Sequence, residues 1–157
     1  MECHDEEATI RLAAGLAPVL RKLARSQAVV VNLVGELGAG KTTFARGLLR
    51  ALGVSGAIRS PTFTLVESYE VDQLRLLHID LYRLESADID SLGLRDFHEA
   101  GCVWLIEWPQ RGEGRLPAPV MEIRLVAIGH DARRVEITHA AGLASPLLDK
   151  AISPTTS

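Results

Sequence analysis

A glycine-rich stretch between two apolar segments is the feature that most constrains the fold of this chain. Residues 35–43 read Gly-Glu-Leu-Gly-Ala-Gly-Lys-Thr-Thr and match the pattern G-x-x-x-x-G-K-[ST]. Residues 28–34 before it are rich in β-branched side chains, which predicts a buried strand. Apolar residues recur at helical spacing over 44–52, and Gly53 stands where helices favour a terminal glycine. The order strand, glycine loop, helix predicts an α/β fold built around this loop.

The residue types of this loop suit phosphate binding. Its glycines let successive backbone N–H groups point inward and form a concave site for phosphate oxygens, and the following helix adds its positive dipole end. Lys41 is expected to reach the β- and γ-phosphates of a nucleotide, and the Thr42 hydroxyl to bind a Mg²⁺ that bridges them. The residues of this loop expected to bind nucleotide are Glu36, Leu37, Gly38, Ala39, Gly40, Lys41, Thr42 and Thr43.

Length and composition indicate a single globular domain that is large enough to form a hydrophobic core. The chain has 157 residues, of which 47% are hydrophobic, and no apolar run is long enough to span a membrane. The acidic N-terminus lacks the basic and apolar regions of a signal peptide, and the two cysteines make neither a disulfide framework nor a metal-ligand spacing. We therefore expect a cytoplasmic protein. The formal net charge of −3 argues against a broad basic surface for DNA or RNA.

Hydrophobic periodicity predicts further elements on both sides of the loop. A first helix is expected over 6–25, with a kink or a break at Gly15 and Pro18. Strands are expected over 64–71 and 74–82, joined as an antiparallel hairpin. The remaining expected elements are one or two short helices within 85–97, a buried strand over 102–106, a loop over 111–119 and strands over 121–128 and 133–138.

The C-terminal segment differs in composition from the rest of the chain. From residue 140 onward Ala, Ser, Pro and Thr dominate. We expect a single domain over residues 1–139 and a disordered, dispensable tail over 140–157.

Polar residues in two segments are candidates for chemistry beside the loop. His78 and Asp80 would share one face of their strand, within reach of the nucleotide, its metal or a switch loop, although a half-exposed edge strand with ordinary polar residues explains them equally well. Ser60 and Thr62 flank Pro61, where a hydroxyl could sense the γ-phosphate or simply form a turn.

Glu107 follows the apolar run 102–106, at the carboxyl end of a strand expected beside the loop. A carboxylate in that place suits Mg²⁺ binding or water positioning, as in the Walker B arrangement. Trp108 is expected to be partly exposed, where it stacks on a ligand or a partner or covers the end of the sheet.

Four stretches together resemble one family. They are the glycine loop through Phe44, Ser-Pro-Thr-Phe-Thr-Leu at 60–65, His-Ile-Asp-Leu-Tyr-Arg at 78–83 and Ile-Glu-Trp-Pro at 106–109. They look like the signature blocks of the bacterial TsaE (YjeE) family, small P-loop ATPases needed for the threonylcarbamoyladenosine modification of tRNA. The blocks occur in the family's order, and the resemblance covers roughly residues 6–139.

The resemblance implies a P-loop NTPase fold, with a mixed central sheet, antiparallel additions and flanking helices. It implies ATP and Mg²⁺ as cofactors, with Thr42 and Glu107 on the metal. Thr62 falls in the family's first switch region, Asp80 matches an aspartate required for activity, and Trp108 matches the tryptophan beside the second acidic metal contact. The expected catalytic residues are Lys41, Asp80 and Glu107.

The resemblance also implies partners. In the family, ATP binding lets the protein join the TsaB–TsaD pair, which transfers a threonylcarbamoyl group to an adenosine beside the anticodon. The partners expected here are therefore the TsaD and TsaB proteins, and contact with tRNA is expected only indirectly, through the complex.

Other function classes compete with an ATP-driven switch. A small-molecule kinase needs an acceptor pocket and an arginine-rich lid, for which Arg111 and Arg115 are available. A GTPase is disfavoured because no Asn-Lys-x-Asp stretch occurs. A nucleotide-dependent tRNA-binding module would use Arg124, Arg133 and Arg134. No arginine stands out as a partner of the γ-phosphate, so we expect slow hydrolysis alone and faster hydrolysis with partners.

Overall fold

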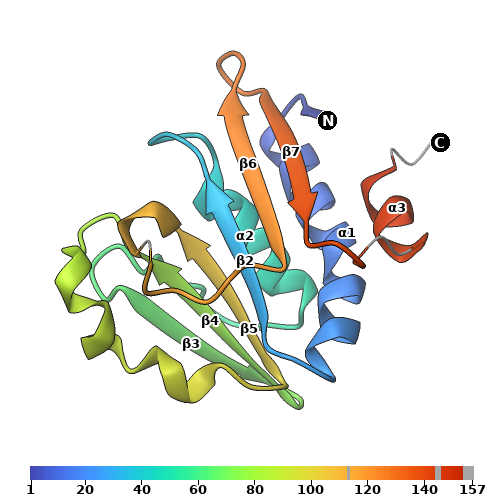
Figure 1. Cartoon of the computed structure of the whole chain (residues 1–157). Helices are drawn as coiled ribbons and strands as arrows, with labels where there is room; N and C mark the ends of the chain where they lie inside the picture. Colours follow the sequence, from blue (N-terminus) through green and yellow to red (C-terminus); the bar gives the residue numbers. More distant parts are fainter. Residues whose placement is uncertain (113, 144–145, 154–157) are drawn as a thin grey trace.

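The computed structural model of the chain describes residues 1–112, 114–143 and 146–153. In these residues a central sheet has the strand order β1-β7-β6-β2-β5-β4-β3, with helices packed on it (Figure 1). The strands are β1 (Glu2–Cys3), β2 (Val29–Val34), β3 (Val66–Val71), β4 (Leu74–Asp80), β5 (Cys102–Glu107), β6 (Met121–Ala127) and β7 (Arg133–His139). The helices are α1 (Glu6–Ala24), α2 (Lys41–Ala51), α3 (Pro146–Ile152) and the short 3-10 helices η1 (Ser86–Leu92), η2 (Leu94–Phe97) and η3 (Pro109–Gly112).

Strand directions in the sheet are mixed. The strands β4, β5, β2 and β6 run parallel to their neighbours within that set, and β3, β7 and β1 each pair antiparallel to the strand beside them. The predicted mixed sheet with antiparallel additions is therefore confirmed, as is the β3–β4 hairpin. The turn between these two strands holds Asp72 in a left-handed conformation, with φ of 53°.

Two apolar cores lie on opposite faces of the sheet. The α-helices cover one face, where Leu16, Leu20, Phe44 and Leu48 are fully buried. Burying this much apolar surface is the main favourable contribution to folding. The 3-10 helices cover the other face around Trp104. The site-bearing strands β2, β5 and β4 are thus covered on both sides, which is typical of parallel strands.

The first helix lies within one residue of its predicted bounds and is more regular than the sequence suggests. Asp5 caps it by accepting a hydrogen bond from the backbone N–H of Ala8 at 2.7 Å. The helix continues through Pro18, so the predicted break is wrong. Because Pro18 is exposed, water can serve the carbonyl that the proline leaves without a partner.

Gly15 of α1 allows the approach of α3. A Cβ atom at this position would lie 3.0 Å from the carbonyl oxygen of Ala151. Leu148 of α3 is only 1% exposed and belongs to the core beside α1. The glycine that the sequence marks as a helix breaker is therefore a contact point between two helices.

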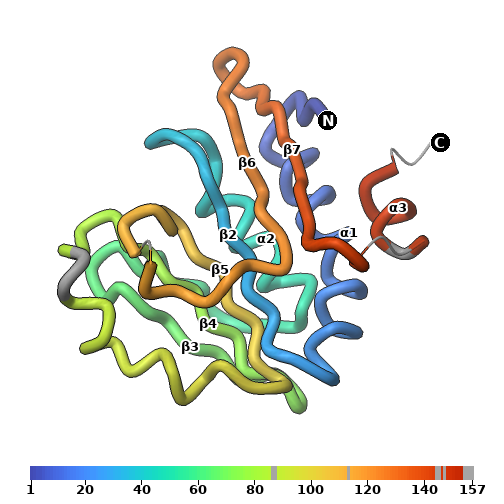
Figure 2. Tube along the Cα trace, in the orientation of Figure 1, coloured from blue at the N-terminus to red at the C-terminus, as the bar shows by residue number. Residues whose placement is uncertain are grey.

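The C-terminal segment differs from the expected disordered tail. Residues 146–152 form α3, because Leu148 and Ile152 lie four positions apart and pack on the α1 face of the sheet. The expectation for residues 144–145 and 154–157 lies outside the described residues. No sequence pattern predicts β1, whose two residues pair with β7 near the N-terminus (Figure 2).

Candidate functional site

Three parallel strands end side by side at the candidate site. The central strand β2 leads into the glycine loop, and its neighbour β5 ends at Glu107, which is in register with Leu33 of β2. The next strand, β4, ends at Asp80, which is in register with Glu107. Carboxyl ends of parallel strands meet at one edge of a sheet, so both carboxylates lie beside the loop. The predicted grouping of the loop with these two residues is what the structure contains.

The glycine loop depends on backbone conformations that glycine adopts readily. Gly38 and Gly40 have φ angles of 77° and 101°, in the left-handed region that costs other residues energy. Lys41 begins α2 directly after the loop, and Phe44 donates its backbone N–H to the Gly40 carbonyl at 2.9 Å. The loop therefore ends at a helix N-terminus, as a phosphate site requires.

Lys41 is folded back onto the loop. Its Nζ donates to the carbonyl oxygens of Gly35 at 2.6 Å and Glu36 at 2.9 Å, and lies 4.3 Å from the ring centroid of Trp108. Burial lowers the pKa of Lys41, against the opposite influence of Glu107 and Asp80. The loop thus holds a partly desolvated cation that has no close carboxylate partner among the described residues, which favours an incoming phosphate.

Glu107 connects the loop with a buried histidine. Its Oε1 accepts a hydrogen bond from the Thr42 hydroxyl at 2.9 Å, and its Oε2 lies 2.7 Å from Nε2 of His78. The side chains of His78 and Glu107 are 0% and 3% exposed. The expected alternative of a half-exposed edge strand is wrong, because β3 forms the edge of the sheet and His78 lies on the face of β4 that the α-helices cover, the face of Leu76. His78 fixes the direction in which Glu107 presents its other oxygen.

The pair Thr42–Glu107 suits a magnesium ion. A hydroxyl and a carboxylate are the hard oxygen donors that Mg²⁺ prefers, and Mg²⁺ commonly takes only one or two protein ligands beside phosphates and water. In the described part of the chain, no three His, Cys, Asp or Glu side chains are grouped to hold a metal by themselves. The residues present therefore fit a metal held jointly with a phosphate ligand.

Asp80 lies beside this pair without pairing directly. Its Oδ1 accepts the backbone N–H of Tyr82 at 3.0 Å. Burial raises the pKa of Asp80, and the nearby carboxylate of Glu107 acts in the same direction. A carboxyl group with a raised pKa beside a phosphate site is suited to accepting a proton or positioning water.

One pocket of about 480 Å³ collects most of the predicted residues. The predicted residues that line it are Leu37, Gly38, Gly40, Lys41, Thr42, Thr43, Thr62, Asp80, Glu107 and Trp108. Glu36 and Ala39 do not line it and instead border a neighbouring depression beside β6. Trp108 is half-buried, as expected, and its ring centroid lies 4.9 Å from that of Tyr82.

The hydroxyl candidates of the Ser-Pro-Thr segment separate in space. Thr62 lines the pocket, whereas Ser60 does not. The Ser60 hydroxyl lies 2.8 Å from the Thr62 hydroxyl, so it is placed to hold Thr62 rather than to meet a ligand.

Sequence reasoning missed two arginines of the pocket. Arg83 and Arg133 both line it, although no arginine stands out from the sequence as a partner of the γ-phosphate. Arg83 belongs to the His-Ile-Asp-Leu-Tyr-Arg stretch, one of the four that carry the family resemblance, so that stretch could have identified it as a site residue. Arg133 comes from β7, far along the chain, and no local pattern identifies it.

A second hollow of about 340 Å³ continues from the pocket past the start of α2. Gly40, Thr43 and Arg133 line both spaces, and the far wall includes Asp5 and Thr9 at the start of α1. The hollow therefore extends the space beside the glycine loop toward the start of α1.

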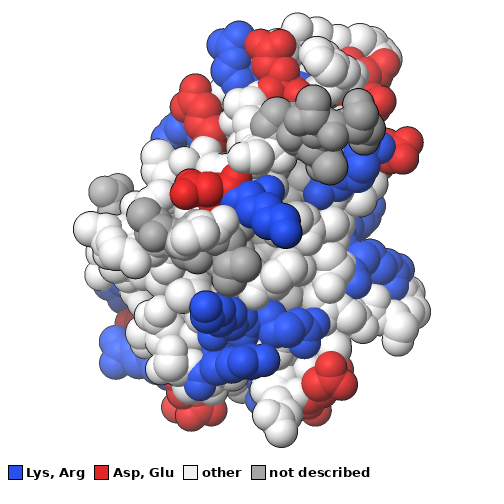
Figure 3. Space-filling view, turned by 90° about the vertical axis from the view of Figure 1, so that its right-hand side faces the viewer, with Lys and Arg blue, Asp and Glu red and all other residues white. Residues whose placement is uncertain are grey.

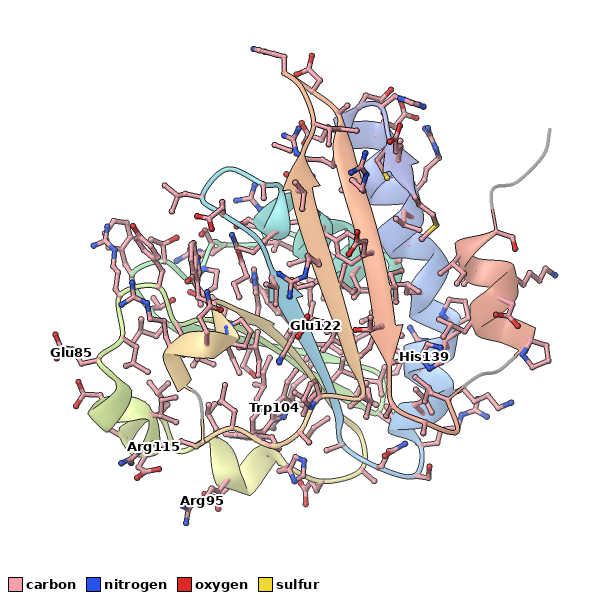
Figure 4. All side chains as sticks on the ribbon, turned by 45° about the horizontal axis from the view of Figure 1, so that its top comes forward. Glu85, Arg95, Trp104, Arg115, Glu122 and His139 are labelled. Atoms are coloured by element: carbon pink, nitrogen blue, oxygen red, sulfur yellow. The ribbon has the colours of Figure 1, made fainter. Side chains whose placement is uncertain are left out.

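The other candidate arginines lie elsewhere. Arg115 donates to Asp90 at 2.8 Å and borders a different pocket with Arg95 (Figure 4). Arg124 and Arg134 form exposed ion pairs with glutamates of the strands. Lys and Arg side chains gather low on the side that bears α1 and α3 (Figure 3), where the last turns of α1 carry basic residues. None of these groups lines the loop pocket.

Comparison with known proteins agrees with this geometry. A family model described as "Threonylcarbamoyl adenosine biosynthesis protein TsaE" matches residues 3–135. The tRNA threonylcarbamoyladenosine biosynthesis protein TsaE of Haemophilus influenzae is 38% identical over 147 residues, which cover 92% of this chain and 91% of that protein. The protein of the same name from Bacillus subtilis is 39% identical over 109 residues, covering 69% of this chain and 68% of the relative.

A solved structure shares the architecture as well. The crystal structure of Bacillus subtilis YdiB has a TM-score of 0.73 and 28% identity, covering 96% of this chain and 91% of that one. The predicted P-loop α/β fold is therefore confirmed. No helix in the described residues is long and apolar enough to cross a membrane. The match of the family model over most of the chain, together with these relatives, shows that the chain belongs to the TsaE family.

Proposed function

We propose that this chain is a Mg²⁺-dependent ATP-binding and ATP-hydrolysing switch protein. In this proposal it joins the TsaB–TsaD pair and supports transfer of a threonylcarbamoyl group to the adenosine next to the anticodon of tRNA. The relatives carry the name tRNA threonylcarbamoyladenosine biosynthesis protein, which supports the pathway. The contact between the Thr42 hydroxyl and Glu107 Oε1, at 2.9 Å beside the glycine loop, is the observation that carries the proposal.

The reaction is hydrolysis of ATP to ADP and phosphate. The bond from the γ-phosphorus to its bridging oxygen breaks, a bond from the water oxygen to that phosphorus forms, and the water loses a proton. Mg²⁺, when bound, neutralises charge on the β- and γ-phosphate oxygens. Thr42 and Glu107 would hold it, and His78 keeps Glu107 in place.

Lys41 and Asp80 take the remaining roles. Lys41 leaves the loop carbonyls and donates to phosphate oxygens, which are stronger acceptors than the carbonyls it contacts now. Asp80 is placed to orient the attacking water and to accept its proton, for which a raised carboxyl pKa is suited.

The competing functions find less support in the same geometry. A kinase lid built on Arg115 is disfavoured because that side chain pairs with Asp90 outside the loop pocket. A tRNA-binding surface built on the three strand arginines is disfavoured because two of them pair with glutamates and Arg133 turns into the pocket. An ATP-driven switch is the function that the residues lining the loop pocket support best.

Calorimetric titration of ATP in Mg²⁺ and in EDTA tests the metal and nucleotide roles. We expect Mg²⁺ to tighten ATP binding to the natural chain, and Glu107→Gln to remove most of that gain while leaving the affinity in EDTA unchanged. Addition of the chain to purified TsaB and TsaD, a threonylcarbamoyl donor and tRNA is expected to support modification only with ATP. Absence of ATP binding, or modification that proceeds equally without ATP, would refute the proposal.

A further inference from the structure

Arg83 is an exposed cation on the wall of the loop pocket, and no acidic side chain of the described residues pairs with it. It lines the same pocket as Lys41 and Thr42. Its Cζ lies 4.5 Å from the ring centroid of Phe63, and it forms no ion pair or hydrogen bond with any described residue. Phe63 is 80% exposed, so the stack lies open to water.

The stack on Phe63 is a weak hold. An exposed cation–π contact is worth about 0.5–1 kcal/mol. A guanidinium that donates to phosphate oxygens makes charge-assisted hydrogen bonds, which are roughly twice as strong as neutral ones. A phosphate group in the pocket therefore draws Arg83 away from the ring.

The chain places both members of the stack close to the chemistry. Arg83 follows Asp80 by three residues, and Phe63 follows Thr62, whose side chain lines the pocket. A movement of Thr62 toward a γ-phosphate therefore also moves the ring on which Arg83 rests.

We propose that Arg83 is a catalytic arginine supplied by the chain itself, which leaves Phe63 and donates to oxygens of the γ-phosphate as ATP is hydrolysed. This inference rests on the proposed function. Arg83 gives and takes no proton, since the guanidinium stays charged; it neutralises charge that builds on the γ-phosphate oxygens. Lys41 remains the cation at the loop, so the two groups are not redundant.

A contact to the γ-phosphate separates ATP from ADP. Removing the guanidinium should weaken ATP binding and leave ADP binding nearly unchanged, because ADP lacks the group that Arg83 meets. Removing the Phe63 ring, which competes with the γ-phosphate for Arg83, should instead strengthen ATP binding. We expect Phe63→Leu to bind ATP about two- to fivefold more tightly, which corresponds to the lost cation–π contact.

The test compares Arg83→Ala with Arg111→Ala. Arg111 is a matched control because it is also exposed and lies over an aromatic ring, with its Cζ 5.7 Å from the centroid of Tyr82, yet it does not line the pocket. The readouts are dissociation constants of ATP and ADP with Mg²⁺, and single-turnover phosphate release. Unchanged ADP binding also verifies that each variant is folded.

For Arg83→Ala we expect about tenfold weaker ATP binding, unchanged ADP binding and a loss of about a thousandfold or more in hydrolysis, within the range of catalytic arginines. Millimolar guanidinium ions should restore part of that rate in Arg83→Ala and none in Lys41→Ala. Equal loss for ATP and ADP, an equal effect of Arg111→Ala, or full activity of Arg83→Ala would overturn the role of Arg83. A natural chain that neither binds nor hydrolyses ATP would instead refute the proposed function.

Discussion

The buried pair of His78 and Glu107 provides a quantitative test of how the metal-binding carboxylate is held. The two side chains are 0% and 3% exposed, and their polar atoms lie 2.7 Å apart. His78→Ala removes the hydrogen bond to a carboxylate, worth about 1.5–3 kcal/mol, and leaves a cavity in the core. Since breaking a buried pair typically costs 3–5 kcal/mol, we expect about 4 kcal/mol of lost stability.

A double-mutant cycle isolates the interaction from the cavity. Glu107→Ala alone removes the same contact from the other side. Both single losses therefore include this contact, whereas the double variant loses it only once. The loss in the double variant should therefore be about 2 kcal/mol smaller than the sum of the two single losses.

Urea unfolding followed by tryptophan fluorescence and circular dichroism measures each free energy, provided that the two signals coincide. Trp104 is a suitable reporter because it is buried in the core on the 3-10 helix face. Additivity within about 0.5 kcal/mol would refute the reasoning, because it would mean that the 2.7 Å contact contributes nothing specific.

Three further perturbations follow from other parts of the structure. Burial raises the pKa of Asp80, so unfolding releases its proton between its ordinary value and the raised one, and stability falls as the pH rises through that window. Asp80→Asn keeps an acceptor for the backbone N–H of Tyr82 and should therefore be more stable than the natural chain at neutral pH. This gain in stability should shrink toward pH 4, where Asp80 is protonated. Equal urea midpoints of the variant and the natural chain at both pH values would contradict this. Gly15→Ala should stabilise a chain ending at residue 143 by about 1 kcal/mol, because alanine has the higher helix propensity. In the full chain the gain in stability should be smaller, or become a loss, because the new Cβ meets the Ala151 carbonyl. The same gain in urea unfolding of both chains would disprove the docking of α3 on α1. Arg133→Ala should weaken ATP and ADP about equally, by roughly tenfold in titration calorimetry, because Arg133 borders both the loop pocket and the adjoining hollow; a loss confined to ATP would contradict that placement.

The central fold could be predicted because its determinants are local. The β-branched run of β2, the glycine loop and the helical spacing of α2 are each legible within a dozen residues. The buried strand before Glu107 predicted that this carboxylate lies beside the loop, whereas the local pattern left Asp80 open and only the family resemblance linked it to the site; the register of β4, β5 and β2 brings both there.

The remainder depends on contacts that a single segment does not encode. Alternation made β4 look like an edge strand, whereas β3 forms the edge and His78 lies on the sheet face that the α-helices cover, the face of Leu76. Arg133 reaches the pocket because β7 pairs with β6, which pairs with β2, a chain of long-range contacts. The helix α3 has a composition typical of a tail, and it forms where Gly15 leaves space for it. Pro18 is tolerated because it lies on the exposed side of α1.

The most direct test of the account is phosphate release from ATP and from GTP, by the purified chain alone and with TsaB and TsaD, with Lys41→Ala as the blank. The account predicts release that prefers ATP, needs Mg²⁺, rises with the partners and disappears in Lys41→Ala, because the lysine that now contacts the Gly35 and Glu36 carbonyls must meet the phosphates. Release that persists in Lys41→Ala, or that ignores the partners and rises with a small acceptor, would contradict it and favour a kinase.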